Sequence, residues 1–113
     1  MEEISVPTFN KLVRDRIPNI IKASGKTPIT KILNQEDYIT ELRKKCEEEL
    51  QEYLSAKTNE ESLEELADLL EIIHALTSIH GSSFEEIEKL RVEKAAKRGS
   101  FLDKVYLIEV CDE

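Results

Sequence analysis

The sequence predicts an all-α or mainly α fold, arranged as an antiparallel helical bundle. Apolar residues recur at helical spacing in three long segments, and residues that favour helix starts and helix ends flank those segments. Of the 113 residues, 40% are hydrophobic and 35% are charged, which is typical of a folded globule. We therefore expect residues 1–113 to form a single domain.

The first two long helices have the clearest boundaries. Asn34 is expected to cap the first helix, because Asp37 follows three positions later and the apolar spacing continues to about residues 56–58. Asn59 is expected to cap the second helix, and Gly81 to end it.

A third long helix and one short helix complete the helical prediction. Ser83 and Glu86 fit a capping box, and Gly99 is expected to end the third helix. Pro18 permits only a short helix near the N-terminus, closed by Gly25. Short turns between the three long helices predict antiparallel packing.

Two segments outside these helices show enough alternation to predict short strands, residues 27–33 and residues 104–110. If they pair, a small two-stranded ribbon joins the N-terminal arm to the C-terminal segment.

Two acid pairs lie on consecutive helices. Glu49 with Glu52, and Glu65 with Asp68, are spaced i, i+3, so each pair shares one face of its helix. Glu49 occupies a position where the apolar stripe calls for a core residue. A carboxylate that points into the core lowers the stability of the fold unless it is paired with a positive charge or coordinates a metal ion.

A solvated acidic face with surface ion pairs is the alternative interpretation, and Lys44 and Lys45 could supply partners on the first helix. The second acid pair has no basic residue between Lys57 and Lys89, so it needs a cation from elsewhere. Oxygen ligands without suitably spaced histidine or cysteine favour Mg²⁺, with Mn²⁺ as a substitute.

The order of motifs resembles the MazG-like branch of the all-α nucleoside triphosphate pyrophosphohydrolases. The acid motifs are Glu48-Glu49-x-x-Glu52 and Glu65-x-x-Asp68, the opening motif spans residues 10–18 and the closing motif spans residues 98–101. The resemblance implies a MazG-like bundle, hydrolysis of a nucleoside triphosphate to monophosphate and pyrophosphate, and a homodimer or homotetramer.

The resemblance also implies roles for individual residues. The metal ligands would be Glu49, Glu52, Glu65 and Asp68. Glu48 would orient a ligand or accept a proton from water, unless it faces solvent. Independently of the resemblance, the phosphate charge needs basic donors, and the candidates are Lys11, Arg14, Arg16, Lys94 and Arg98, although Arg98 could instead only complement the C-terminus of its helix.

Phosphoribosyl-ATP pyrophosphohydrolases share both acid motifs and are the enzymatic alternative, and a non-enzymatic acidic helical adaptor is the alternative from another class.

A net charge of -8 argues against a nucleic acid polymer as partner. Charged residues interrupt the apolar stretch at 66–79, so we expect no membrane span and a cytoplasmic location.

Overall fold

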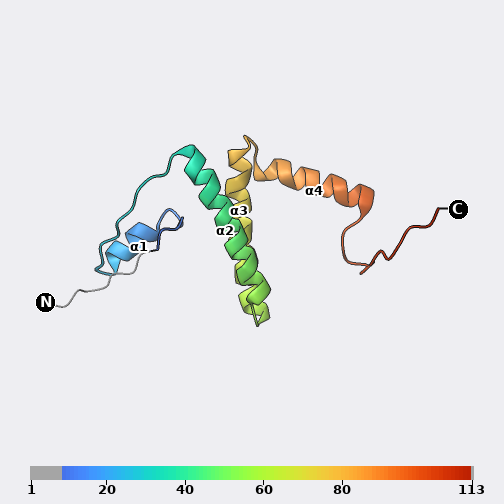
Figure 1. Ribbon diagram of the computed structural model, residues 1–113, viewed down its shortest axis with the longest axis horizontal. Coiled ribbons are helices and arrows are strands. Elements are labelled where there is room, and N and C mark those ends of the chain that lie inside the picture. The colour runs from blue at the N-terminus through green and yellow to red at the C-terminus, as the bar shows by residue number, and fades with distance from the viewer. Residues whose placement is uncertain (1–8, 113) are drawn as a thin grey trace.

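A computed structural model describes residues 9–112, and within them the chain is helical without strands (Figure 1). The helices are α1 (Ile17–Ala23), α2 (Gln35–Ser55), α3 (Asn59–Ile79) and α4 (Phe84–Arg98). The predicted all-α class is confirmed for this part of the chain.

Side-chain caps fix the starts of the long helices. The Asn34 side chain accepts a hydrogen bond from the Asp37 amide at 2.8 Å, as predicted. The predicted cap of α3 is wrong by one residue. Thr58, with φ of -121°, is the extended residue whose hydroxyl accepts the Glu61 amide at 3.1 Å, and Asn59 is already helical.

The remaining predicted boundaries are confirmed. The Ser83 hydroxyl caps α4 by accepting the Glu86 amide at 3.3 Å, and Pro18 lies in the first turn of α1. Gly81 and Gly99 follow α3 and α4 with φ of 68° and 82°. Glycine reaches this left-handed region without steric strain, which allows the chain to leave each helix there.

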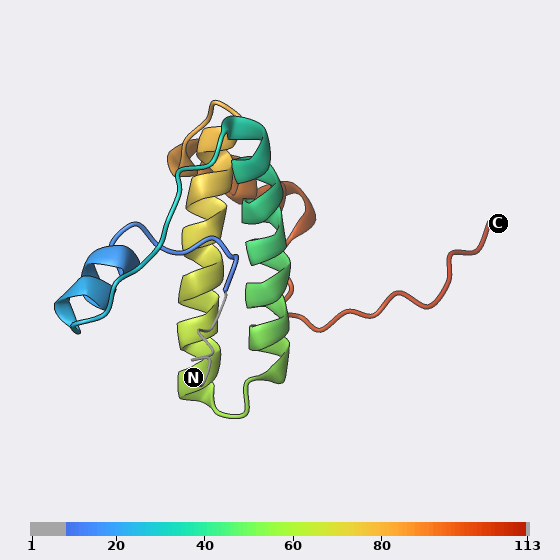
Figure 2. The same ribbon diagram turned by 60° about the vertical axis from the view of Figure 1, so that its left-hand side comes forward.

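The centre of the molecule is an antiparallel pair formed by α2 and α3, which lie side by side in Figures 1 and 2. The short connection at residues 56–58 holds them together. Leu42 of α2 is the most buried hydrophobic residue, with 2% of its surface exposed, and Thr77 of α3 is also buried. The interface therefore sets the relative register of the two helices.

Helix α4 departs from the predicted antiparallel bundle. It contacts α3 near their shared turn, where the His74 and Phe84 rings stack with centroids 4.0 Å apart. Beyond that turn α4 runs away from the α2–α3 pair (Figure 1). A single chain therefore forms a helical hairpin of α2 and α3, from which α4 projects.

The predicted ribbon is also absent from the described residues. Residues 27–33 connect α1 to α2, whereas residues 104–110 extend away beyond α4, and neither segment is a strand. Paired strands must lie about 4.8 Å apart. The direction of α4 carries residues 104–110 away from residues 27–33, and no ladder joins the two segments in this structure.

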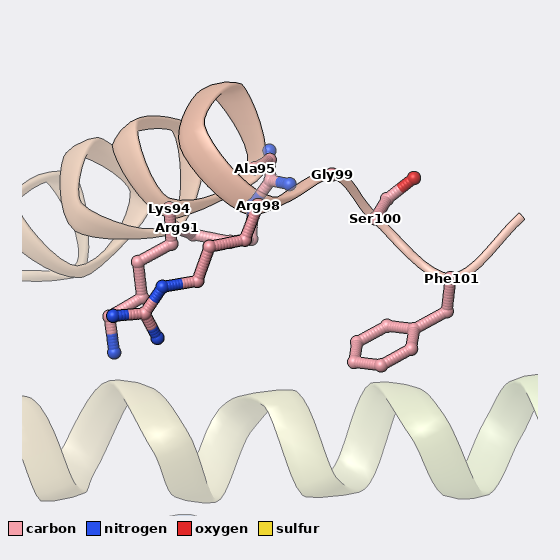
Figure 3. Close-up of a pocket in the computed structure, with 7 residues that line it drawn as sticks. All are labelled: Arg91, Lys94, Ala95, Arg98, Gly99, Ser100 and Phe101. Carbon is pink, nitrogen blue, oxygen red and sulfur yellow. The ribbon is translucent and has the colours of Figure 1, made fainter. Parts of the chain in front are cut away.

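The C-terminal end of α4 carries an open, basic pocket of about 500 Å³ (Figure 3). Arg91 is held by Glu88, one turn earlier on the same helix. Phe101 is 97% exposed. The residues that line the pocket are Arg91, Lys94, Ala95, Arg98, Gly99, Ser100 and Phe101.

The isolated chain is elongated, with a radius of gyration of 20.0 Å, against about 13 Å for a compact domain of this length. Leucines on α3 remain exposed, including Leu63 at 66%, Leu66 at 43% and Leu70 at 45%. Among the helices that the structure describes, none has the length and apolar composition needed to cross a membrane.

The position of the α3 cap gives a direct test of this local structure. Thr58→Ala removes the hydroxyl that accepts the Glu61 amide, so we expect it to lower the free energy of unfolding by about 1 kcal/mol. Asn59→Ala is the matched control and should be neutral or slightly stabilising, because alanine favours the helical position that Asn59 occupies. Urea unfolding of both variants measures the difference, and equal losses would contradict the assignment.

Candidate metal centre

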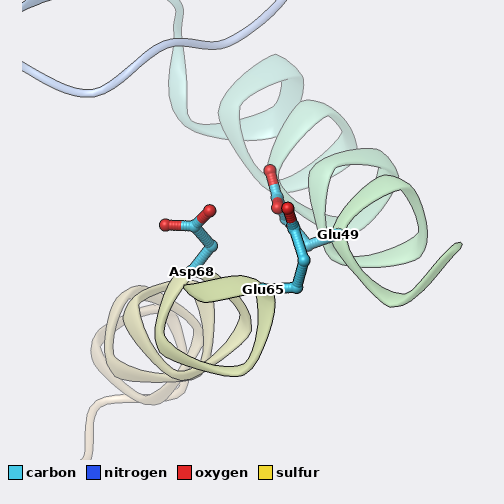
Figure 4. Close-up of side chains that lie close together, drawn as sticks. All are labelled: Glu49, Glu65 and Asp68. Carbon is cyan, nitrogen blue, oxygen red and sulfur yellow. The ribbon is translucent and has the colours of Figure 1, made fainter. Parts of the chain in front are cut away.

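The α2–α3 register brings three carboxylates together from two helices. Glu49 of α2 lies opposite Glu65 and Asp68 of α3, and one oxygen from each lies within 4.8 Å of the others. Figure 4 shows the three side chains pointing to the same side of the helix pair. The i, i+3 spacing of Glu65 and Asp68 accounts for their shared face.

Glu49 is in the expected inward position, with 6% of its surface exposed. Glu65 and Asp68 are partly exposed. The Oε2 atoms of Glu49 and Glu65 are buried and accept no hydrogen bond from any described residue. Since an unpaired buried carboxylate oxygen is costly, these two atoms need a cation or a proton.

Burial and the neighbouring carboxyl groups raise the pKa values of Glu49 and Glu65. The neighbouring Glu52 carboxyl contributes most to raising the pKa of Glu65 to about 7, followed by burial and by the charges of Glu52, Asp68 and Glu49. Burial, followed by contact with Glu52, raises the pKa of Glu49 as well, although Lys45 opposes this shift. Glu52 is therefore part of the acid cluster, which we define as Glu49, Glu52, Glu65 and Asp68.

Two basic side chains contact the acid cluster. Lys45 Nζ lies 3.6 Å from Oε1 of Glu49 and 3.6 Å from Oε2 of Glu48, and its side chain is only 19% exposed. Arg14 belongs to the N-terminal arm, by which we mean residues 9–16 before α1. It donates a hydrogen bond of 2.7 Å to Oδ1 of Asp68. Two single positive charges leave the cluster of four carboxyls incompletely neutralised.

The cluster fits a hard divalent cation. All donors are carboxylate oxygens, and magnesium–oxygen distances of about 2.1 Å place ligand oxygens about 3 to 4 Å apart in an octahedron. The oxygens of Glu49, Glu65 and Asp68 lie within 4.8 Å, so small side-chain rotations would complete the geometry. The two unpaired buried oxygens are atoms that such a cation would pair, as a proton would in its absence.

The other predicted site residues are spread over the molecule. Glu48 lies beside the cluster and pairs with Lys45 on the exposed side of α2. Lys11 lies over the ring of Phe9, 5.7 Å from its centroid, and Arg16 directly precedes α1. Lys94 and Arg98 line the pocket at the far end of α4, remote from the acids of the same chain.

The pair between Arg14 and Asp68 is the contact that the sequence did not predict. The residues are 54 positions apart, and no periodic pattern connects them. The available signal was the absence of basic residues around Glu65 and Asp68, which indicated a cation from another segment. Arg14 supplies that charge in this structure.

Comparison with known proteins finds similarity over part of the sequence. The sequence is 44% identical over 54 residues to an uncharacterised protein of Mycolicibacterium smegmatis, and the match covers 48% of this chain and 55% of that protein. The matching region thus spans about half the length of this relative. No protein-family model matches the sequence, and no solved structure matches it.

The raised pKa of Glu65 predicts how stability depends on pH without metal. Its folded pKa is about 7 against an ordinary 4.5, so between these values the folded chain holds a proton that the unfolded chain releases. This contribution is fully present below about pH 4.5 and is lost as pH rises through about 7. Glu65→Gln should reduce the loss of stability between about pH 4.5 and about pH 7, measured by urea unfolding with a chelator. An unchanged pH profile in the variant would contradict the assignment.

Burial of Glu49 predicts the effect of neutralising it. Without metal, Glu49→Gln removes a repelled, buried carboxylate, so the fold should be as stable as wild type or slightly more stable. Glu47→Gln makes the same change at an exposed position two residues away and should stay within about 0.5 kcal/mol of wild type. Thermal and urea unfolding measure both variants. A marked loss of stability in Glu49→Gln alone would show that the pair with Lys45 outweighs the repulsion.

Proposed function

We propose that this chain hydrolyses a nucleoside triphosphate to nucleoside monophosphate and pyrophosphate with Mg²⁺ as cofactor, Mn²⁺ being a substitute. Nucleotide-pool house-cleaning in the cytoplasm is the corresponding cellular role. The proposal extends to a MazG-like bundle assembled from more than one chain.

One observation carries the proposal. Buried carboxylate oxygens of Glu49 and Glu65, which no described residue hydrogen-bonds, face each other across two helices. They belong to the two acid motifs that resemble those of the MazG-like pyrophosphohydrolases. A solvated acidic face does not account for a glutamate that is 6% exposed.

The acid cluster would hold the metal through Glu49, Glu52, Glu65 and Asp68. Bound there, magnesium would neutralise phosphate charge and lower the pKa of the attacking water. Glu49 is fixed by its burial, whereas Asp68 lies at the more open edge beside the arm. This arrangement leaves a route by which a triphosphate approaches from the arm side.

Glu48 is the candidate for proton acceptance or ligand orientation. It lies one position from Glu49, about 100° around the helix, and its side chain is 43% exposed. Lys45 bridges the two glutamates at 3.6 Å from each. A base in this position would be held by the lysine and remain open to water.

The triphosphate needs more positive charge than the acid cluster supplies. Arg14 already lies at the cluster, and Lys11 and Arg16 belong to the same arm. Lys94 and Arg98 would reach the acids only from a second chain, because α4 projects away in its own chain. A homodimer or homotetramer would therefore complete the substrate site and cover the exposed leucines of α3.

Product analysis tests the reaction itself. With magnesium, we expect monophosphate and pyrophosphate from a panel of ribo- and deoxyribonucleoside triphosphates, with water oxygen entering the monophosphate because attack is at the α-phosphorus. Reaction in oxygen-18 water, followed by mass spectrometry, locates the label. Orthophosphate as the first product, or label in pyrophosphate, would contradict the mechanism. Including phosphoribosyl-ATP in the panel tests the enzymatic alternative, and no turnover of any substrate would favour the adaptor.

The ligand variants test the site. Glu65→Gln and Asp68→Asn should each lower turnover by more than the roughly 10- to 100-fold typical of residues that only support metal ligands. Glu47→Gln, on the exposed face of the same acidic run, should retain wild-type turnover. Initial rates at saturating magnesium measure the effect. Comparable losses in all three variants would indicate a general charge effect.

Assembly has its own test. Analytical ultracentrifugation should give the mass of a dimer or tetramer, because one chain leaves Leu63, Leu66 and Leu70 exposed. Leu66→Glu should shift the population towards monomer and lower turnover with it. A fully active monomer whose mass does not depend on concentration would refute the shared-site proposal.

A further inference from the structure

The pair between Arg14 and Asp68 connects the N-terminal arm to the acid cluster. Arg14 Nη2 lies 2.7 Å from Oδ1 of Asp68, the shortest of the ion pairs at this cluster. In Figure 2 the arm, drawn in blue, passes in front of α3 on its way to α1. The contact therefore joins a segment outside the helical hairpin to one of the carboxylates that point into the cluster.

A backbone hydrogen bond and partial burial hold the arm in place around Arg14. The Ile17 amide donates a hydrogen bond of 3.1 Å to the Arg14 carbonyl, which closes a turn directly before α1. Leu12 and Ile17 on either side are half-buried. The Arg14 side chain is 59% exposed, so it can leave Asp68 at little packing cost, and the arm then loses the ion pair that joins it to α3.

Charge determines what happens when a divalent cation enters. In the described residues, Arg14 and Lys45 are the only basic groups that pair with the cluster. Arg14 binds Oδ1 of Asp68, which is one of the candidate metal ligands. A cation coordinated by Asp68 would lie next to the guanidinium and repel it. The exposed Arg14 can move away, whereas Lys45 is 19% exposed and is held by two glutamates.

We propose that Arg14 is a resident counter-ion that competes with the divalent metal for Asp68, so that metal binding releases the N-terminal arm from the cluster. This inference rests on the proposed metal site. The exchange breaks the Arg14–Asp68 ion pair and leaves the guanidinium available for a phosphate group of the substrate. Metal loading thus prepares the arm for the triphosphate.

Metal affinity gives the first test. Arg14→Gln removes the competitor, so titration calorimetry with Mn²⁺ or Mg²⁺ should show binding tighter by about two- to fivefold, the size expected of one exposed ion pair. Arg16→Gln removes the same charge from the same arm without removing that pair, and its effect should be clearly smaller. Weaker or unchanged metal binding in Arg14→Gln would overturn the proposal.

Limited proteolysis gives a second readout that does not depend on activity. Magnesium should stabilise the fold as a whole, yet trypsin should cut wild type after Lys11 and Arg16 faster once the metal is bound. In Arg14→Gln the same cuts should be fast with or without metal. Protection of the wild-type arm by magnesium would overturn the proposal, because it would place the arm more firmly on the loaded site.

The wild-type titration separates this proposal from the proposed function. If wild type binds no divalent metal, or if Glu49→Gln binds it as well as wild type does, the metal site itself is wrong and the counter-ion role falls with it. If wild type binds metal through Glu49 but Arg14→Gln leaves the affinity unchanged, only the counter-ion role is wrong.

Discussion

The packing of α2 against α3 brings like-charged carboxylates together, and the candidate site depends on that contact between the two helices. Leu42 and Thr77 pack the α2–α3 interface, and that packing sets the register that turns Glu49 towards Glu65 and Asp68. Electrostatic repulsion among these acids opposes the same packing. This repulsion contributes to the raised pKa values of Glu49 and Glu65. The positive charges of Arg14 and Lys45 partly offset it.

Local features of the fold could be predicted from the sequence because their causes are local. The caps at Asn34 and Ser83 and the stop at Gly99 follow from side chains within a few positions of each helix end. The shift of the α3 cap to Thr58 has an equally local cause. Thr58 and Asn59 both suit a cap, and the choice depends on which of them is extended where the chain turns. The inward position of Glu49 followed from helical periodicity alone.

Long-range features could not be predicted in the same way. The direction of α4 depends on packing between helices, and the stack of His74 on Phe84 fixes only the start of α4. The ribbon depended on that direction, since α4 determines where residues 104–110 lie. Arg14 reaches Asp68 across 54 positions. A one-dimensional pattern indicated the missing positive charge but not the residue that provides it.

The short connection between α2 and α3 has a consequence for how the acid cluster forms during folding. All four acids fall between positions 49 and 68, and residues 56–58 connect the two helices that carry them. The contacts that assemble the cluster are therefore of low contact order, and helical hairpins of this kind close quickly. The carboxylates therefore come close together and repel one another early in folding, before the N-terminal arm has bound to them. The N-terminal arm lies outside this hairpin, so its contact with Asp68 would form only after the two helices have closed.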